Sequence, residues 1–274
     1  MPDPDLPPET LPSPPGVGFD PAFGGPVPPD PGATTLPSAP PATPAWLRAL
    51  GEMLLCSSVV TQLAIGWTLQ GAGWSPVDDK GEFQLGFIAA LTLLDTMALI
   101  ALMVWLMRRH GERPSALWIG NRFPPREVLT GVLHLPIVFM IGASLLLTLR
   151  AFAPELHDVK VNPFEALAGD SLREAAMLTL VAIVGGGVRE ELQRAFLLDR
   201  FERHLGPAWL GVVLLSIAFG LGHLPQGRDA AVATGAMGAF WAVVYLRRRS
   251  SVAPMMSHAL FNALQVATIV ALNR

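Results

Sequence analysis

Seven long apolar stretches follow one another along the chain, and turn-forming Gly, Pro and Asn residues separate them. Each approaches or exceeds the roughly 20 apolar residues that an α-helix needs to cross the hydrocarbon core of a membrane. The pattern therefore predicts an all-α protein, a polytopic transmembrane bundle of about seven helices. The expected helices are Trp46–Leu69, Phe83–Met107, Val128–Phe152, Leu172–Arg203, Pro207–Leu224, Ala230–Leu246 and Val252–Leu272.

The chain ahead of these stretches has a different composition. Its first 44 residues hold 16 of the 26 prolines and five acidic residues, but no Lys or Arg. Such a segment buries too little apolar surface to offset the entropy of ordering it. We therefore expect residues 1–45 to form a disordered, proline-rich tail, and we find no signal peptide in it because no basic start precedes an apolar run.

Composition narrows the class of protein further. Hydrophobic residues make up 51% of the chain and charged residues 15%, whereas soluble domains have about 25% charged residues. One cysteine, Cys56, excludes an intramolecular disulfide and a cysteine-based metal site. No basic patch stands apart from the arginines that flank the apolar stretches, so the sequence argues against nucleic acid as a partner. Membrane lipids are the expected surroundings.

The basic residues predict how the chain is oriented in the membrane. Alternate loops are rich in arginine, and the positive-inside rule assigns such loops to the cytoplasm. We therefore predict a multi-pass protein of the cell membrane with the tail inside and the C-terminus outside. The arginines that define the cytoplasmic side are Arg108, Arg109, Arg113, Arg122, Arg126, Arg200, Arg203, Arg247, Arg248 and Arg249.

Several ionisable residues fall inside the apolar stretches. Each costs at least ~2.5–3.5 kcal/mol within the hydrocarbon, so each is a candidate functional residue. The densest group is Arg189-Glu190-Glu191-Leu-Gln-Arg194, in which Glu190 and Arg194 are four residues apart and can pair on one helix face. Asp95 and His134 lie elsewhere, and we interpret them as hydrogen-bonded polar residues of the interior.

Two later helices carry polar residues at depths that suit a common site. His258 and Asn262 are four apart on the last helix. At 1.5 Å per residue, Glu190 and His223 lie roughly 22 and 26 Å from the turn near residue 205, and so at similar heights. A carboxylate with one imidazole can hold and deprotonate a water, while a second imidazole and an amide can stabilise an oxyanion. The alternative is a buried ion-pair cluster that only fixes helix packing.

At these residues the chain resembles the CAAX-processing and bacteriocin-processing (CPBP, or Abi) family of intramembrane proteases. The family has a Glu-Glu-x-x-x-Arg motif, then Phe-x-x-x-His, then His-x-x-x-Asn or Asp. Here Phe219-Gly-Leu-Gly-His223 and His258-Ala-Leu-Phe-Asn262 match the second and third motifs. The first motif is one residue shorter than the family pattern, but Glu190 matches a family glutamate whether the alignment follows the acidic pair or the arginine.

The resemblance covers Leu172–Asn273 and implies an intramembrane endopeptidase acting on membrane-associated, lipid-modified or membrane-inserted peptides. Glu190, helped by Glu191, would activate water with His223, and His258 and Asn262 would stabilise the oxyanion. Arg194 and Phe219 would be structural partners of the site. No cofactor is favoured; the alternative is a zinc ion held by Glu190, His223 and His258.

This interpretation divides the chain into the tail, N-terminal transmembrane helices and loops over residues 46–170, and a CPBP-like catalytic helical core over residues 171–274. Two other functions remain open. The irregular first motif favours a non-catalytic immunity or scaffold protein of the same family. The intramembrane charges would also suit a small-solute transporter, although we find no internal sequence repeat to support one.

Overall fold

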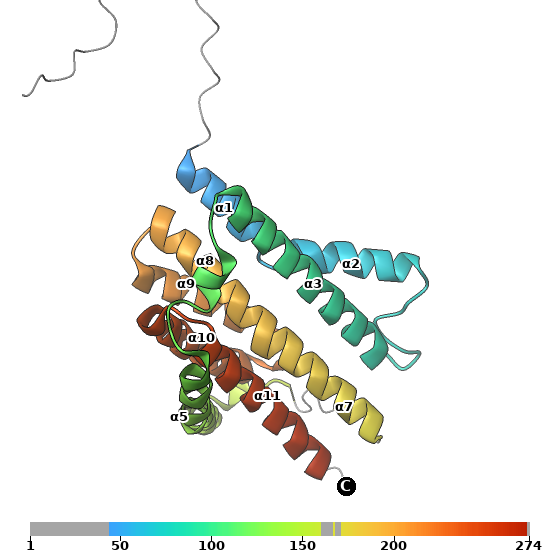
Figure 1. Cartoon of the computed structure of the whole chain (residues 1–274). Coiled ribbons are helices and arrows are strands. Elements are labelled where there is room, and N and C mark those ends of the chain that lie inside the picture. Colours follow the sequence, from blue (N-terminus) through green and yellow to red (C-terminus); the bar gives the residue numbers. More distant parts are fainter. Residues whose placement is uncertain (1–43, 160–166, 168–170, 273–274) are drawn as a thin grey trace, which may run out of the picture. The chain divides into compact units, whose positions relative to one another are not determined.

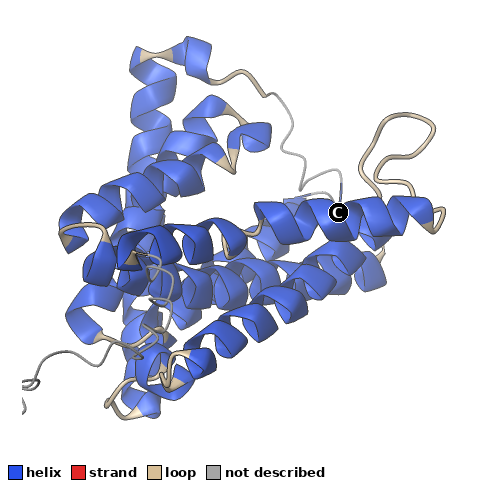
Figure 2. Ribbon diagram, turned by 90° about the horizontal axis from the view of Figure 1, so that it is seen from above, coloured by secondary structure: helices blue, strands red, loops and turns tan. Residues whose placement is uncertain are grey.

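The structure, a computed structural model, describes residues 44–159, 167 and 171–272. The predicted tail falls outside this part of the chain apart from its last two residues. Within the described residues the regular structure is helical, and one isolated bridge between Val77 and Phe83 is the only β pairing (Figure 2). The predicted all-α fold class is therefore confirmed.

Each predicted apolar stretch contains helical structure. The first stretch forms two helices, and the fourth forms one long helical segment with a π-helix, η2, in its middle (Figure 1). A short helix, α4, and two 3-10 turns, η1 and η3, lie in the connections. The elements are α1 (Ala45–Leu55), α2 (Val59–Gly71), α3 (Leu85–Arg109), α4 (Pro114–Trp118), α5 (Pro124–Phe152), η1 (Pro154–Leu156), α7 (Leu172–Val181), η2 (Ala182–Arg189), α8 (Glu190–His204), α9 (Ala208–Leu221), η3 (Leu224–Gln226), α10 (Arg228–Arg248) and α11 (Val252–Leu272).

Five helical segments among the described residues are long and apolar enough to cross a membrane, two fewer than the sequence predicts. The other two stretches are helical but differ from the five in length or composition. Helix α9 has only 14 residues, and the α7–η2–α8 segment carries the charged motif. The chain is thus a multi-pass membrane protein. The five spans are Ala45–Gly71, Leu85–Arg109, Pro124–Phe152, Arg228–Arg248 and Val252–Leu272.

The first predicted helix is interrupted between α1 and α2. Ser58 adopts a left-handed conformation with φ of 67°, which an L-residue other than glycine adopts only at a cost of about 1–2 kcal/mol. Two hydrogen bonds hold the break: the Ser57 hydroxyl donates to the Leu54 carbonyl, and the Gln193 amide donates to the Cys56 carbonyl at 2.7 Å. The break therefore fixes where α2 starts, and it is tied to α8.

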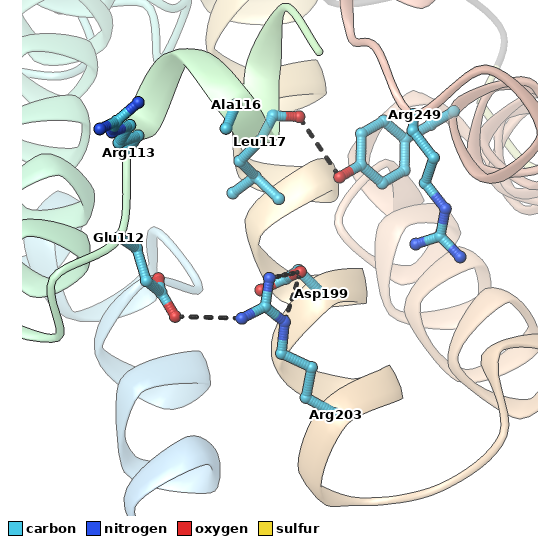
Figure 3. A pocket seen from close by; sticks show the side chains of 8 residues that line it. Glu112, Arg113, Ala116, Leu117, Asp199, Arg203 and Arg249 are labelled. Carbon is cyan, nitrogen blue, oxygen red and sulfur yellow. Dashed lines mark hydrogen bonds and ion pairs between the residues drawn. The ribbon is translucent and has the colours of Figure 1, made fainter. Parts of the chain in front are cut away.

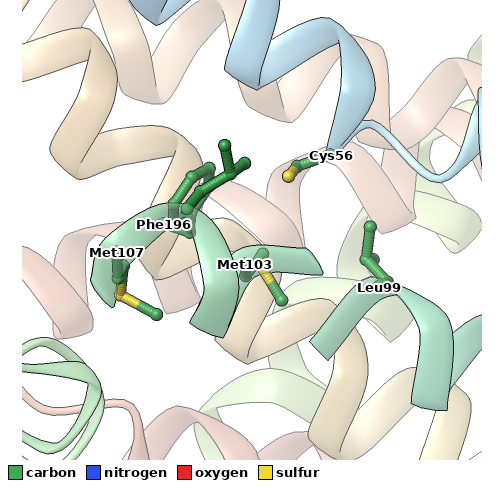
Figure 4. Close-up of a cluster of buried hydrophobic side chains, with 6 residues drawn as sticks. Cys56, Leu99, Met103, Met107 and Phe196 are labelled. Carbon is green, nitrogen blue, oxygen red and sulfur yellow. The ribbon is translucent and has the colours of Figure 1, made fainter. Parts of the chain in front are cut away.

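Apolar packing holds the α7–η2–α8 segment on two sides. It runs beside α3 and α11 (Figure 1) and contacts both. On the α3 side, a fully buried cluster joins α3 to α8 and to the end of α1 (Figure 4). On the α11 side, Leu178 of α7 packs with Val266 of α11, and both are buried. A separate cluster around Trp241, which is 1% exposed, joins α5, α10 and α11. The first cluster consists of Cys56, Leu99, Leu106, Met103, Met107 and Phe196.

Three consecutive glycines lie in the π-helix, and they allow neighbouring helices to approach its backbone. A Cβ atom at Gly185 would lie 2.5 Å from the Thr92 side chain on α3. A Cβ atom at Gly187 would lie 2.5 Å from the Ala259 Cβ atom on α11. The glycines therefore bring α3 and α11 close to η2, directly ahead of the charged motif. Such π-turns are frequent at functional sites.

Candidate active site

One imidazole of the site is held between α8 and α10. His258 Nδ1 lies 2.8 Å from Glu191 Oε1, and because a carboxylate only accepts, Nδ1 carries the proton. The His258 ring stacks on the indole of Trp241, with centroids 3.8 Å apart and planes 14° apart. Glu191 and His258 are both buried, at 2% and 4% exposure. The imidazole plane is thereby fixed, and Nε2 points away from Glu191.

Glu190 lies on the other side of this imidazole. Its Oε1 accepts a hydrogen bond from Arg189 Nη2 at 3.1 Å. Its Oε2 is buried, and within the described part of the chain it has no hydrogen-bond partner. This oxygen lies 3.9 Å from His258 Nε2, which is too far for a direct hydrogen bond. The structure thus leaves one carboxylate oxygen and one imidazole nitrogen facing each other without a bond.

The predicted pair between Glu190 and Arg194 is wrong. Arg194 instead donates to Oε1 of Glu191, three residues earlier. Residues three and four apart both lie on one face of a helix, so the shortened motif still brings its second glutamate and its arginine together. The Arg194 guanidinium also lies over the Phe219 ring at 4.6 Å and near Trp241 at 5.7 Å. Arg194 and Phe219 therefore border the Glu191–His258 pair.

His223 reaches this group only through an aromatic ring. Its Nδ1 lies 2.8 Å from the Phe219 carbonyl oxygen, so Nδ1 donates and Nε2 is left as an acceptor. Its ring packs on Phe219 at 4.7 Å, and Phe219 lies edge-on to His258 at 6.2 Å. No described carboxylate forms an ion pair with His223. The similar depths predicted for Glu190 and His223 do not result in a contact between them.

Asn262 lies against the π-helix. Its Nδ2 donates to the Ala182 carbonyl at 3.0 Å. A Cβ atom at Gly186 would clash with this amide and would lie 3.6 Å from His258 Nε2. Gly186 therefore keeps the space beside Asn262 and His258 free of a side chain. One Nδ2 hydrogen of Asn262 remains for another acceptor.

The zinc alternative does not fit these positions. In the described ranges, no three His, Cys, Asp or Glu side chains are arranged to hold a metal ion. Glu190, His223 and His258 therefore do not form a ligand set in the described part of the chain.

Sequence reasoning placed Asp95 in the interior but missed its connection to the site. Asp95 is fully buried and accepts hydrogen bonds from Thr61, Gln62 and Arg189. The expected hydrogen bonding of His134 is not found at its Nδ1, which has no partner in the described part of the chain. Trp241 was also missed, since an apolar residue in an apolar helix gives no signal of its own.

A second polar cluster lies at the opposite end of α8 and contains none of the predicted catalytic residues. It borders a cavity of about 320 Å³, shown in Figure 3. Within it, Arg203 pairs with Asp199 at 2.8 Å and with Glu112 at 3.4 Å. The cavity is lined by Glu112, Arg113, Ala116, Leu117, Asp199, Arg203, Tyr245 and Arg249.

Comparison with known proteins agrees with the three motifs. Residues 172–264 match the family described as type II CAAX prenyl endopeptidase Rce1-like. This range contains every predicted site residue, from Glu190 to Asn262, and the resemblance to the CPBP family is therefore confirmed over it. At the level of the family, the match is to CAAX-type intramembrane proteases. Neither a curated protein nor a solved structure is significantly similar to the chain.

Proposed function

We propose that the chain is an intramembrane endopeptidase in which Glu190 activates a water for attack on a peptide bond. The observation that carries the proposal is the buried Oε2 of Glu190, which has no partner among the described residues and lies 3.9 Å from His258 Nε2. A buried polar atom without a hydrogen bond is costly for folding, so such an atom calls for an explanation. A water bound to both atoms would satisfy them.

The reaction then uses groups that the site already holds. Glu190 takes a proton from the water, and the resulting hydroxide attacks the carbonyl carbon of the peptide. In this proposal His258 is an imidazolium throughout the reaction, with Nδ1 bonded to Glu191 and Nε2 facing Glu190. Its Nε2–H and the remaining Nδ2 hydrogen of Asn262 donate hydrogen bonds to the oxyanion, and neither proton is transferred. Glu190 passes its proton to the leaving nitrogen as the C–N bond breaks, which yields a carboxyl group and an amine. Glu191 and Trp241 keep the His258 ring in the required plane.

His223 belongs to the proposal as an assisting group. Its Nδ1 donates to the Phe219 carbonyl, so its Nε2 is left as an acceptor for a hydrogen bond from the substrate. The mechanism needs no metal ion, and we propose a metal-free reaction that continues in a strong chelator. Chelator-sensitive activity together with stoichiometric zinc in the purified protein would contradict this.

The proposed substrates are membrane-associated proteins or peptides with a lipid-modified or membrane-inserted C-terminal segment. The match to a family described as CAAX prenyl endopeptidases supports a prenylated C-terminus as the first probe. The five apolar spans would keep the site beside such a lipid. We propose the cell membrane as the location, with the arginine-rich loops in the cytoplasm.

The test is a cleavage assay on the purified full-length chain in liposomes. The probes are a quenched-fluorescent peptide ending in a farnesylated CAAX sequence and a transmembrane peptide without lipid. We expect Glu190→Gln to lower kcat by about 10² or more, the range for loss of a general base. Glu155→Gln, an exposed glutamate on η1 without an ion pair among the described residues, is the matched control and should keep wild-type activity.

Two outcomes would contradict the proposal. Full activity in Glu190→Gln would show that Glu190 is not the base. A wild-type chain that cleaves neither probe would favour the non-catalytic alternative, in which the same charges only fix helix packing.

A further inference from the structure

A buried carboxylate outside the family match is connected to the site. Asp95 lies on α3 and is 0% exposed. Its Oδ1 accepts from Thr61, and its Oδ2 accepts from Gln62 at 3.2 Å and from Arg189 Nη1. Thr61 and Gln62 are in the first turn of α2. The break at Ser58 therefore turns α2 so that two donors meet Asp95.

Arg189 joins this carboxylate to the site. It is the last residue of the π-helix and is 8% exposed. Its Nη1 donates to Asp95 and its Nη2 donates to Glu190 Oε1 at 3.1 Å. The guanidinium is planar and rigid, so attaching Nη1 to Asp95 also sets the direction of Nη2. That direction holds Glu190 by Oε1 and leaves Oε2 facing His258.

We infer that Asp95 is a positioning residue of the hydrolytic site, acting on Glu190 through Arg189. The inference rests on the function proposed for Glu190. Without the Asp95 charge, the Arg189 guanidinium is free to form a two-pronged pair with Glu190, which occupies both carboxylate oxygens. Asp95 prevents this by taking one side of the guanidinium. Helices α2 and α3, which lie outside the family match, thereby complete the site.

The first arm of the test measures cleavage. Asp95→Asn keeps the shape of the side chain and removes its charge. We expect kcat to fall by about tenfold or more with KM unchanged, because the loss concerns the base and not substrate binding. The matched control is Glu127→Gln, which removes the charge of a similarly buried carboxylate on α5 that pairs with Arg248 on α10 (Nε–Oε2 2.6 Å). It should lower stability but leave the kcat of the folded protein unchanged. An Asp95→Asn kcat equal to that of Glu127→Gln would overturn the positioning role.

The second arm measures stability and does not depend on cleavage. Thermal unfolding midpoints are compared for Asp95→Asn, Glu190→Gln and the double variant. Each single variant leaves Arg189 one carboxylate, whereas the double variant leaves a buried guanidinium without either. We therefore expect the midpoint of the double variant to fall by more than the sum of the two single shifts.

The two arms separate the failure of this inference from the failure of the proposed function. Additive midpoint shifts would overturn the bridge through Arg189, whether or not the protein cleaves peptides. A non-additive cycle in a chain that cleaves neither probe would support the bridge and overturn only the proposed function.

Discussion

Helix α8 carries one charge cluster at each end, and the two differ in how well their atoms are paired. At the C-terminal end, Arg200 is 2% exposed and bonds to Glu52 at 2.7 Å, to Glu112 at 2.7 Å and to Asp199 at 3.1 Å. No buried side-chain atom of this cluster lacks a partner in the described ranges. At the N-terminal end, Oε2 of Glu190 does lack one.

Both ends of α8 are rich in charged residues, so the number of charges does not tell a structural cluster from a candidate site. The presence of an unpaired buried atom does distinguish them. The Arg200 cluster ties α1 and the segment after α3 to α8, and a fully satisfied network of this kind is explained by packing alone. A buried oxygen without a hydrogen bond lowers the stability of the fold, and no packing contact compensates for this loss. Among the described residues, buried atoms without a partner also occur away from this end, at His134 Nδ1 and Ser251 Oγ. The Glu190 end is distinguished by the position of its free oxygen, which faces Nε2 of His258.

Among the tests of this difference between the two ends of α8, we expect the largest change in stability from Arg200→Met. Removing the guanidinium leaves three carboxylates close together, and breaking a buried ion pair costs about 3–5 kcal/mol. We expect a marked fall in the free energy of unfolding, with the kcat of the folded protein unchanged. Thermal or denaturant unfolding in detergent and the liposome assay measure the two quantities.

Arg203→Met is the control for this variant, because the Arg203 side chain is 53% exposed and its pairs are worth less than about 1 kcal/mol. A large loss of kcat in Arg200→Met without a loss of stability would show that the C-terminal cluster also takes part in the reaction.

A smaller effect is expected at the N-terminal end from Glu191→Gln. The amide oxygen can still accept from His258 Nδ1, but it lacks the charge that stabilises a protonated imidazole. We expect kcat to fall by about 10–100-fold with KM unchanged, less than in Glu190→Gln. Steady-state kinetics of the two variants side by side provide the measurement. If Glu191→Gln abolishes cleavage and Glu190→Gln does not, the base is Glu191.

The smallest effect concerns the partly exposed pair of Glu202 and Arg249 near the C-terminal cluster, outside the five spans. Arg249 donates to both Glu202 oxygens, at 2.5 and 2.7 Å, and these bonds lower the pKa of Glu202 from its ordinary value of 4.5. Since the folded-state pKa is depressed, the stabilisation is present above pH 4.5 and is lost as pH falls through the folded-state value. The pair is partly exposed, so its contribution is under about 1 kcal/mol.

The measurement is the difference in unfolding free energy between wild type and Glu202→Gln from neutral to acidic pH. We expect this difference to vanish at acidic pH. A difference that stays constant with pH would show that the pair does not contribute through the charge of Glu202.

Local patterns predicted most of the fold. The apolar stretches identify the helical segments because burial in lipid requires a long run of apolar residues, which is visible without knowing any neighbour. The break at Ser58 was not predicted, since Cys56-Ser57-Ser58 lies within an apolar run and only contacts with α8 fix its conformation. The division of the fourth stretch into α7, η2 and α8 was also not predicted, because its charged residues interrupt the apolar pattern.

The sequence by itself determined which helices carry the three motifs and that Glu190, Glu191, His258 and Asn262 lie on two of them. Only the tertiary structure decided how these residues pair. Which way a side chain points depends on the rotation of its helix, and the π-turn ahead of Glu190 changes that rotation. Glu191 therefore meets Arg194 and His258, while Arg189 links Glu190 to a carboxylate 94 residues away in the sequence.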